Sequence, residues 1–209
     1  MTSFVVFLSA AAAYLLGSIN TAILVGKCMK NIDIRDYGSK NAGTTNALRV
    51  LGKKAAAIVA LGDAVKGVIA VLVSMLLCKI FNVSSKTALY AAGLFAVLGH
   101  NFPLYFKFKG GKGVLTSIVT VIMLDPFVGT ITLLFAVLVI ALTRYVSLGS
   151  CLGAVLLVIL SLVFRIHDVY FVVLCFILAV LVLVRHKQNI KRLISGTESK
   201  LGAKNKTNQ

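Results

Sequence analysis

Three short polar stretches interrupt this very apolar chain, and they carry the residue types of a phosphate-binding surface. Residues 35–46 read RDYGSKNAGTTN, residues 108–113 read FKGGKG, and residues 185–189 read RHKQN. Glycine backbone, small hydroxyls, amides and cations can together replace the water around an anion. Because each stretch lies at the end of an apolar run, we predict that they form one anion site at the edge of a membrane.

The first stretch predicts a loop that wraps a ligand rich in oxygen atoms. Glycine lets the backbone approach closely, while hydroxyls and amides supply directional hydrogen bonds. The alternative is a turn-rich connection in which Asn46 caps the next helix. The density of polar residues favours a site, with contacts expected from Arg35, Ser39, Lys40, Asn41, Thr45, Asn46 and Arg49.

The second stretch opens directly into an apolar helix, so a helix N-terminus would face a bound phosphate. From it we predict contacts by Lys109, Gly110, Gly111, Lys112 and Gly113. The stretch is not a nucleotide-binding P-loop, because a glycine follows Lys112 and the first glycine of that motif is absent. The alternative is a basic topology anchor with flexible glycines.

The third stretch offers a histidine and an amide on one face of a continuing helix, since His186 and Asn189 are three residues apart. A histidine near neutral pKa can orient or deprotonate a hydroxyl. The alternative is that His186 only complements the dipole at the end of a helix. Ser147 and Ser150 lie at the same level and are expected to add hydroxyl donors, or else to serve as N-caps.

The composition identifies the bilayer as the solvent for the elements that carry these motifs. Apolar residues make up 59% of 209 positions and charged residues only 13%, against roughly 25% in soluble domains. The formal charge of +16 lies in loops rather than on a soluble basic face, which argues against nucleic acid as a partner. We predict one membrane domain over residues 1–202 and a basic, disordered tail over residues 203–209.

The apolar runs predict about seven transmembrane helices in an all-α polytopic bundle. They cover Ser3–Gly26, Ala55–Cys78, Thr87–Phe106, Gly113–Leu124, Phe127–Thr143, Ser147–Phe164 and Val169–Val184. The first three can cross a hydrocarbon core of about 30 Å, whereas the later four must thin the bilayer or pack around a recessed site. Residues 113–143 form either two crossings or a re-entrant hairpin, and both leave the side of every other loop unchanged.

Lysine and arginine place the predicted site on the cytoplasmic side. Of the 22 such residues, 18 lie in residues 27–54, in residues 107–112, at Arg144 or from Arg185 onward. Loops rich in cations stay in the cytoplasm, because moving cations across the bilayer is unfavourable. We therefore expect the N-terminus outside and the C-terminus inside.

Ionisable residues inside the apolar runs predict internal pairing rather than metal or nucleophilic chemistry. Asp63 and Lys66 are three residues apart and should neutralise each other, and His100 should line the site or bond a carbonyl. No histidine has an aspartate four residues later, no carboxylate cluster suits two metals, and no serine or cysteine has a paired base and acid. No metal and no cofactor are expected.

With these residues in view, the chain strongly resembles the bacterial acyl-phosphate:glycerol-3-phosphate acyltransferase family, the PlsY type. The resemblance covers nearly the whole chain as a series of ordered motifs. They lie at residues 16–19, 33–35, 38–41, 45–49, 62–63, 66–67, 99–103, 108–114, 185–186 and 196–198.

This resemblance implies acyl transfer from a fatty acyl phosphate to the first hydroxyl of glycerol 3-phosphate. The products would be lysophosphatidic acid and inorganic phosphate, made at the cytoplasmic face of the bacterial cytoplasmic membrane. An acyl phosphate is already activated, so the enzyme mainly has to neutralise two phosphates, align the hydroxyl and polarise the carbonyl. The implied partners are both substrates, membrane lipids and the enzyme that produces acyl phosphate.

The resemblance also implies roles for individual residues. Ser39 and Arg49 would serve the first motif, the Gly110–Gly113 loop would bind glycerol phosphate, and His186 with Asn189 would serve the third motif; Glu198 would be structural. We group Ser150 with the catalytic residues and Ser147 with the phosphate-binding ones.

Two positions depart from the family pattern. Lys40 stands where glycine is usual and should add a cation near the phosphates, and Asn20 stands where proline is usual and should only relax the first helix.

A membrane carrier or binding protein for a phosphorylated or other anionic metabolite is the alternative function. A carrier would be expected to hold its site near the membrane centre, often between repeated halves. The polar motifs here lie at one membrane edge, and no repeat is evident in the sequence.

Overall fold

The computed structural model describes residues 1–202, and it confirms the all-α fold class for that part of the chain. The long helices are α1 (Thr2–Gly17), α4 (Lys53–Ile80), α5 (Lys86–Asn101), α6 (Val114–Leu124), α7 (Pro126–Thr143), α8 (Val146–Phe164) and α9 (Val169–Arg185). Shorter ones are α2 (Thr21–Lys30), α3 (Thr44–Val50), α10 (Lys187–Ile194) and the 3-10 helices η1 (Ile34–Asp36) and η2 (Leu104–Phe106). The tail predicted for residues 203–209 lies outside the described residues.

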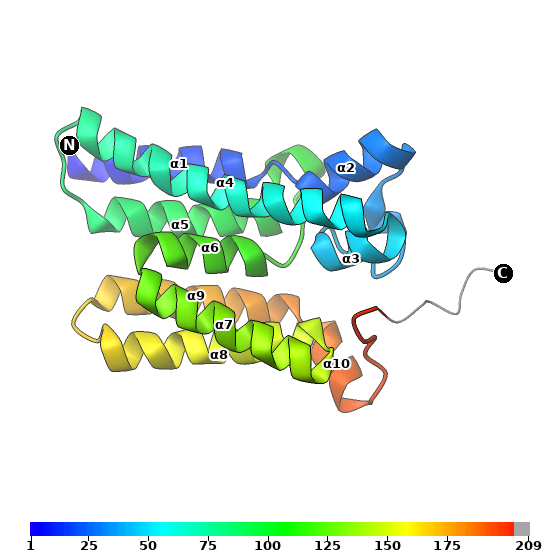
Figure 1. The fold of residues 1–209 in the computed structure, drawn as a ribbon. Helices are drawn as coiled ribbons and strands as arrows, with labels where there is room; N and C mark the ends of the chain where they lie inside the picture. Colours follow the sequence, from blue (N-terminus) through cyan, green and yellow to red (C-terminus); the bar gives the residue numbers. More distant parts are fainter. Residues whose placement is uncertain (203–209) are drawn as a thin grey trace.

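The long helices form two groups joined by α6. Helix α1 packs against α4 and α5, while α8 packs against both α7 and α9 (Figure 1). Helix α6 contacts α4, α5 and α7, so it holds the two groups together. Helices α2, α3 and α10 gather at the end of the molecule opposite the N-terminus (Figure 1).

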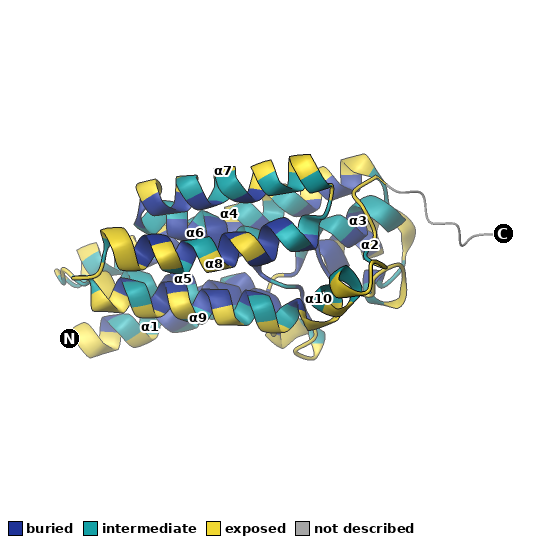
Figure 2. Cartoon of the chain, turned by 90° about the horizontal axis from the view of Figure 1, so that it is seen from below, coloured by how far each residue is buried: buried dark blue, intermediate teal, exposed yellow. Residues whose placement is uncertain are grey.

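The surface of the bundle is apolar, as a lipid-facing surface must be. Leu61, Leu134 and Leu142 are 62–76% exposed, and exposed positions alternate with buried ones along α7 and α8 (Figure 2). By length and composition, four helical segments can cross a membrane, or five if α9 and α10 form one bent span. Helices α5 and α6 have 16 and 11 residues, so the expected count of seven crossings stays a prediction.

The first predicted helix, Ser3–Gly26, is in fact broken between α1 and α2. Asn20 adopts an extended backbone, and its side chain accepts a hydrogen bond from the Ile23 N–H at 3.1 Å, which caps α2. Asn20, which we expected only to relax the first helix, is thus the N-cap at a break in it. Tertiary bonds support the break, because the Ser18 hydroxyl accepts from the Leu104 N–H at 3.2 Å.

Two further predicted ends differ from the structure. The run Thr87–Phe106 stops being α-helical at Asn101, two residues before Pro103. The reason is that Phe102 precedes the proline, and a residue in that position disfavours the α-helical backbone conformation. The chain also bends by 61° between α9 and α10, at His186. The expectation that the last apolar helix continues through His186 and Asn189 is therefore wrong.

Small residues bring α1 and α5 close together. A Cβ atom on Gly17 would collide with the Ala96 carbonyl, and one on Gly99 would lie 2.8 Å from the Ser18 nitrogen. Close backbone approach at glycine is a common way to pack helices in lipid, where no hydrophobic driving force acts between them. This packing fixes the end of α5 beside the break between α1 and α2.

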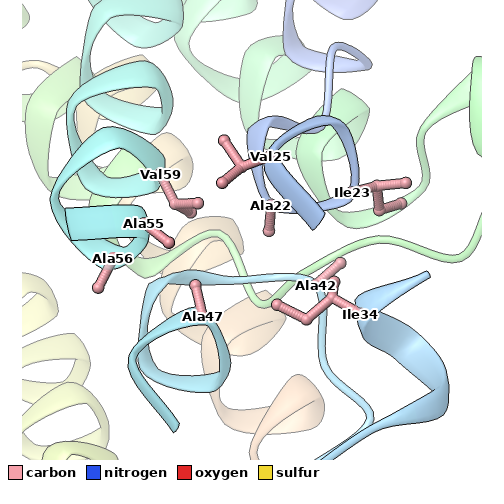
Figure 3. Packing of buried hydrophobic residues seen from close by; sticks show 9 residues of the cluster. All are labelled: Ala22, Ile23, Val25, Ile34, Ala42, Ala47, Ala55, Ala56 and Val59. Atoms are coloured by element: carbon pink, nitrogen blue, oxygen red, sulfur yellow. The ribbon is translucent and has the colours of Figure 1, made fainter. Parts of the chain in front are cut away.

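A compact apolar cluster supports the first polar stretch. Its buried members are small aliphatic residues of α2, α3, α4 and the loop between them (Figure 3): Ala22, Ile23, Val25, Ile34, Ala42, Ala47, Ala55, Ala56 and Val59. Burial of each of the larger of these side chains contributes about 1.5–3 kcal/mol. The loop over residues 31–43 therefore rests on a packed base.

Candidate functional site

One large cavity brings the three polar stretches together at the end of the molecule where α2, α3 and α10 lie. Its volume is about 1230 Å³, and every predicted site residue except Gly111 lines it. An apolar arm extends between α6, α7 and α8, lined by residues that include Ile118, Leu133, Val137, Ile140 and Val146. The cavity is therefore amphipathic, with a cationic mouth and an apolar arm.

Arg35 is a strut between the first two stretches. Its guanidinium forms an ion pair with Asp33 at 2.6 Å and donates to the carbonyls of Phe106 and Lys109 at 2.9 and 3.0 Å. The ion pair holds the pKa of the Asp33 carboxyl below its usual value. We predicted that Arg35 donates hydrogen bonds to a ligand. Much of its donor capacity is instead used to hold the two loops together.

Asn46 is buried beneath the first loop and holds Ser39 in place. Its amide oxygen accepts from the Ser39 N–H at 2.8 Å, and its amide nitrogen donates to the carbonyls of Ile34 and Tyr37 at 3.0 Å each. Asn46 lies inside α3 rather than at its N-cap, which is Gly43. Its amide therefore shapes the loop around Ser39.

The Gly110–Gly113 loop is clamped from two sides. The N–H groups of Gly110 and Gly111 donate to the carbonyls of Asn101 and His100 at 3.2 and 3.1 Å. Arg185 donates to the carbonyls of the same two glycines at 2.9–3.1 Å. These two N–H groups therefore have partners within the protein, whereas we predicted that both glycines contact a phosphate.

Gly111 does not line the cavity, so its contact with a ligand stays a prediction. A Cβ atom there would collide with the His100 ring and lie 2.6 Å from the Ala42 carbonyl oxygen. A glycine is therefore required here because the first loop, α5 and the second loop meet at this residue.

Lys112 and the start of α6 present positive charge to the cavity. Gly113 is the N-cap with φ of 74°, and no side chain caps this helix, so the N–H groups of its first turn have no intrahelical acceptor. The Lys112 ammonium donates to the Asn189 amide oxygen at 2.5 Å. Burial lowers the pKa of Lys112 to about 8; Arg192 and Arg49 add to this shift, and Glu198 opposes it.

Glu198 joins the third stretch to α8. Its carboxylate accepts from the Ser147 hydroxyl at 2.8 Å, from the Asn189 amide at 2.6 Å and from Arg192 at 2.7 Å. Burial raises the pKa of Glu198, but these three donors outweigh it and hold the pKa below its usual value. The result is a chain of hydrogen bonds from Lys112 through Asn189 to Glu198.

Ser147 and Ser150 of α8 are not N-caps, because Tyr145 occupies that position. The Ser147 hydroxyl donates to Glu198, and the Ser150 hydroxyl donates to the Val146 carbonyl at 2.9 Å. Both hydroxyl hydrogens are therefore engaged, and each oxygen keeps acceptor capacity.

His186 is nearly fully buried and stays neutral. Its Nδ1 lies 2.8 Å from the Val182 carbonyl oxygen, which can only accept, so Nδ1 carries the proton. Burial and the charges of Lys112 and Arg185 lower the pKa of His186 to about 4. The Nε2 atom therefore keeps its lone pair and can accept a hydrogen bond in the cavity.

Comparisons with known proteins agree on one family. The family model for glycerol-3-phosphate acyltransferase matches residues 7–196. Similar relatives include the glycerol-3-phosphate acyltransferases of Thermoanaerobacter sp. (strain X514), 49% identical over 94% of this chain and 96% of the relative, and of Clostridioides difficile (strain 630), 40% identical over 98% and 99%. The chain belongs to the glycerol-3-phosphate acyltransferase family.

Solved structures of this family share the fold. The glycerol 3-phosphate form of PlsY, an integral membrane glycerol 3-phosphate acyltransferase, superposes with a TM-score of 0.85 at 35% identity, over 94% of this chain and 96% of that one. Its lysophosphatidic acid form gives 0.82 at 34% identity, over 94% and 95%. This acyltransferase is thus an integral membrane protein of phospholipid synthesis, and the carrier alternative loses its support.

Lys40, which we expected to stand in place of a glycine, has the backbone conformation that glycine adopts most readily. Its φ is 57°, in the left-handed region that favours glycine and costs other residues about 1–2 kcal/mol. The acyltransferase accepts this strain and gains a cation at the cavity wall, since Lys40 lines the cavity.

Several residues of this acyltransferase site escaped the sequence analysis. Arg192 gave no signal beyond its charge, and Arg185 was noted only as part of a motif. The partners of Arg185, the carbonyls of Gly110 and Gly111, lie 74–75 residues away, whereas Arg192 pairs with Glu198, six residues further on. The buried ion pair expected between Asp63 and Lys66 is present at 2.8 Å, and His100 joins it at the cavity wall.

We expect Glu198→Gln to lower the thermal stability of the enzyme at pH 7, because a charge-assisted hydrogen bond contributes about 1.5–3 kcal/mol. The pKa of Glu198 is lower in the folded than in the unfolded state, so its contribution is complete above pH of about 4.3 and disappears as pH falls through the folded value. Melting curves in detergent from pH 7 to 3 should show a weaker acid dependence in the variant.

The matched control is Asp36→Asn, which removes an exposed carboxylate. If Glu198→Gln melts like the wild type at pH 7, the contacts of Glu198 contribute nothing to stability.

Proposed function

We propose that this acyltransferase uses a fatty acyl phosphate as donor and acylates the sn-1 hydroxyl of glycerol 3-phosphate. The observation that carries the proposal is the amphipathic cavity, whose mouth joins Lys112, Arg49 and the first turn of α6 to an apolar arm. Two phosphate groups need cations, and a fatty chain needs an apolar arm that opens beside them. The products are lysophosphatidic acid and inorganic phosphate.

The reaction needs little acid–base chemistry from the protein. The acceptor hydroxyl oxygen forms a bond to the acyl carbon, and the bond from that carbon to the phosphate oxygen breaks. The electron pair of that bond leaves with the phosphate, which also takes up the proton of the hydroxyl. The main tasks are therefore to align the substrates and to stabilise negative charge.

We assign the alignment of the acceptor hydroxyl to His186 and Asn189. The neutral His186 offers Nε2 as an acceptor, and Asn189 holds Lys112 at 2.5 Å. Ser39 and Arg49, with Ser150 nearby, are assigned to the donor, since its phosphate needs a cation and hydroxyl donors. Lys112, with Lys40, Lys109, Asn41 and Thr45, is assigned to phosphate binding.

The donor is tested by competition. Purified enzyme is supplied with radiolabelled glycerol 3-phosphate and, in separate reactions, with palmitoyl phosphate, palmitoyl-CoA or palmitoyl acyl carrier protein. We expect lysophosphatidic acid to form from palmitoyl phosphate alone, because the leaving group must fit a site built from cations. Faster transfer from either thioester would overturn the proposed donor while leaving the family assignment unchanged.

We expect Lys112→Ala to raise the KM for glycerol 3-phosphate roughly 10- to 100-fold with little change in kcat, since a ground-state phosphate contact contributes uniform binding. Because the pKa of Lys112 is lowered to about 8, the wild-type KM should also rise above pH 8 as the ammonium loses its proton. Lys112→Arg should keep KM flat across that range, since arginine stays charged.

Initial rates from pH 6 to 10 measure this effect. Lys54→Ala is the control, because Lys54 is exposed and does not line the cavity. A KM that is unchanged in Lys112→Ala removes Lys112 from the phosphate site.

We also propose that the cavity faces the cytoplasm, with Ser39, Lys112 and His186 inside and Lys86 and His167 outside. The proposal rests on the positive-inside rule and on 18 inward cations. Lys86 and His167 line a separate depression that also includes Arg165, Asp168 and Tyr170.

Single cysteines test this orientation in a background from which Cys28, Cys78, Cys151 and Cys175 have been removed. Ser39→Cys and Lys187→Cys, both at exposed residues, should be protected from a membrane-impermeant thiol reagent in intact cells, whereas Lys86→Cys should react. The opposite pattern would invert the topology.

A further inference from the structure

The apolar arm of the cavity lies between two helices that are joined by a single residue. Helix α6 ends at Leu124 and α7 begins at Pro126, so Asp125 alone connects them. The two helices lie together at this connection and separate toward the end of the molecule that holds α10 (Figure 1). The arm therefore has the form of a wedge. Its lining residues on the two helices are Val114, Leu115, Ile118, Leu133, Ala136, Val137 and Ile140.

The narrow end of the wedge is closed by backbone contact between α6 and α7. A Cβ atom on Gly129 of α7 would lie 2.6 Å from the Ile122 nitrogen of α6. Neither of these residues lines the cavity. One helical turn nearer the mouth, Ile118 is the last apolar lining residue of α6 and Leu133 is the first lining residue of α7. These two side chains therefore form the closed end.

The two sides of the wedge differ. On one side α8 packs closely against α7, because a Cβ atom on Gly149 would lie 2.7 Å from the Ala136 carbonyl oxygen. On the other side Val137 lines the cavity and is nevertheless 52% exposed at the apolar surface of the bundle. A chain in the wedge can therefore reach that surface past Val137.

The length of the wedge follows from the helix that lines it. Leu133 and Ile140 are seven residues apart on α7, which corresponds to about 10 Å along the helix axis. An extended hydrocarbon chain advances roughly 1.3 Å per carbon, given single bonds of about 1.5 Å. The wedge therefore has room for about eight carbons in line, and a palmitoyl chain is much longer than this.

We propose that the wedge binds only about the first eight carbons of the acyl chain, and that Ile118 and Leu133 at its closed end determine selectivity for them. The inference rests on the proposed function. The rest of a longer chain leaves the wedge past Val137 and lies against lipid. Selectivity for the donor then depends on the carbons next to the carbonyl group, whereas the total chain length has little effect.

Two isomeric donors test the inference with the wild-type enzyme. Both are palmitoyl phosphates with two added methyl groups, which are attached to carbon 6 in one isomer and to carbon 14 in the other. Because they are isomers, they partition alike between detergent and water. We expect kcat/KM to be roughly 10- to 100-fold lower for the carbon-6 isomer, since a packed apolar site resists added volume. Equal values for the two isomers would overturn the inference.

Variants at the closed end test the two named residues. In Leu133→Trp we expect the ratio of kcat/KM for palmitoyl phosphate to that for butyryl phosphate to fall roughly 10- to 100-fold. The added ring fills the space of the distal carbons, which the short butyryl chain does not reach. Ile118→Trp should have the same effect from the opposite wall. The ratio for one preparation does not depend on the fraction of folded enzyme, so a poorly folding variant is still informative.

The matched control is Leu134→Trp. Leu134 follows Leu133 on the same helix, but it is 62% exposed and does not line the cavity. The ratio should stay at the wild-type value in this variant.

A ratio that is unchanged in both Leu133→Trp and Ile118→Trp would overturn the inference, and so would an equal fall in Leu134→Trp. Wild-type formation of lysophosphatidic acid from palmitoyl phosphate is measured in the same series. Its absence would contradict the proposed donor rather than the wedge, and the two isomers would then be supplied as thioesters of coenzyme A.

Discussion

The structure depends on gathering positive charge at one end of the helix bundle with few acids to balance it. The chain has 22 lysine and arginine residues against 6 acidic ones. Backbone carbonyls supply much of the compensation: Arg185 binds those of Gly110 and Gly111, and Arg35 binds those of Phe106 and Lys109. Carbonyl oxygens satisfy a guanidinium without adding negative charge. These contacts hold the walls without adding negative charge, and the positive field remains available to an anion.

The sequence predicted which residues gather at the site better than it predicted what each one does. Residue type marks a side chain that can bind an anion, but its partner lies far away in the chain. Arg35 is satisfied by a carbonyl 71 residues further on, and Gly111 is set by contacts with His100 and Ala42. Only the fold shows that Arg35 and Gly111 help to hold the loops in place.

The sequence also predicted the positions of the helices better than the breaks within them. Lipid demands continuous apolar helices, so composition alone predicted α6 to α9 to within one or two residues at each end. The breaks were missed because polar tertiary contacts stabilise them. Ser18 accepts from the Leu104 N–H, and the Tyr14 hydroxyl donates to the Phe102 carbonyl, so the interrupted ends of α1 and α5 supply partners for each other.

The protonation state of His186 follows from the same concentration of charge. A cationic imidazole beside Lys112 and Arg185 would add a charge that burial already opposes, so the histidine stays neutral well below pH 7. Such a histidine is a weak base, and a reaction that needed a strong one would be slow here. Transfer from a mixed anhydride with phosphate does not need one, since the departing phosphate takes the proton. The charge that we propose binds the substrates would thus also favour a donor that carries its own proton acceptor.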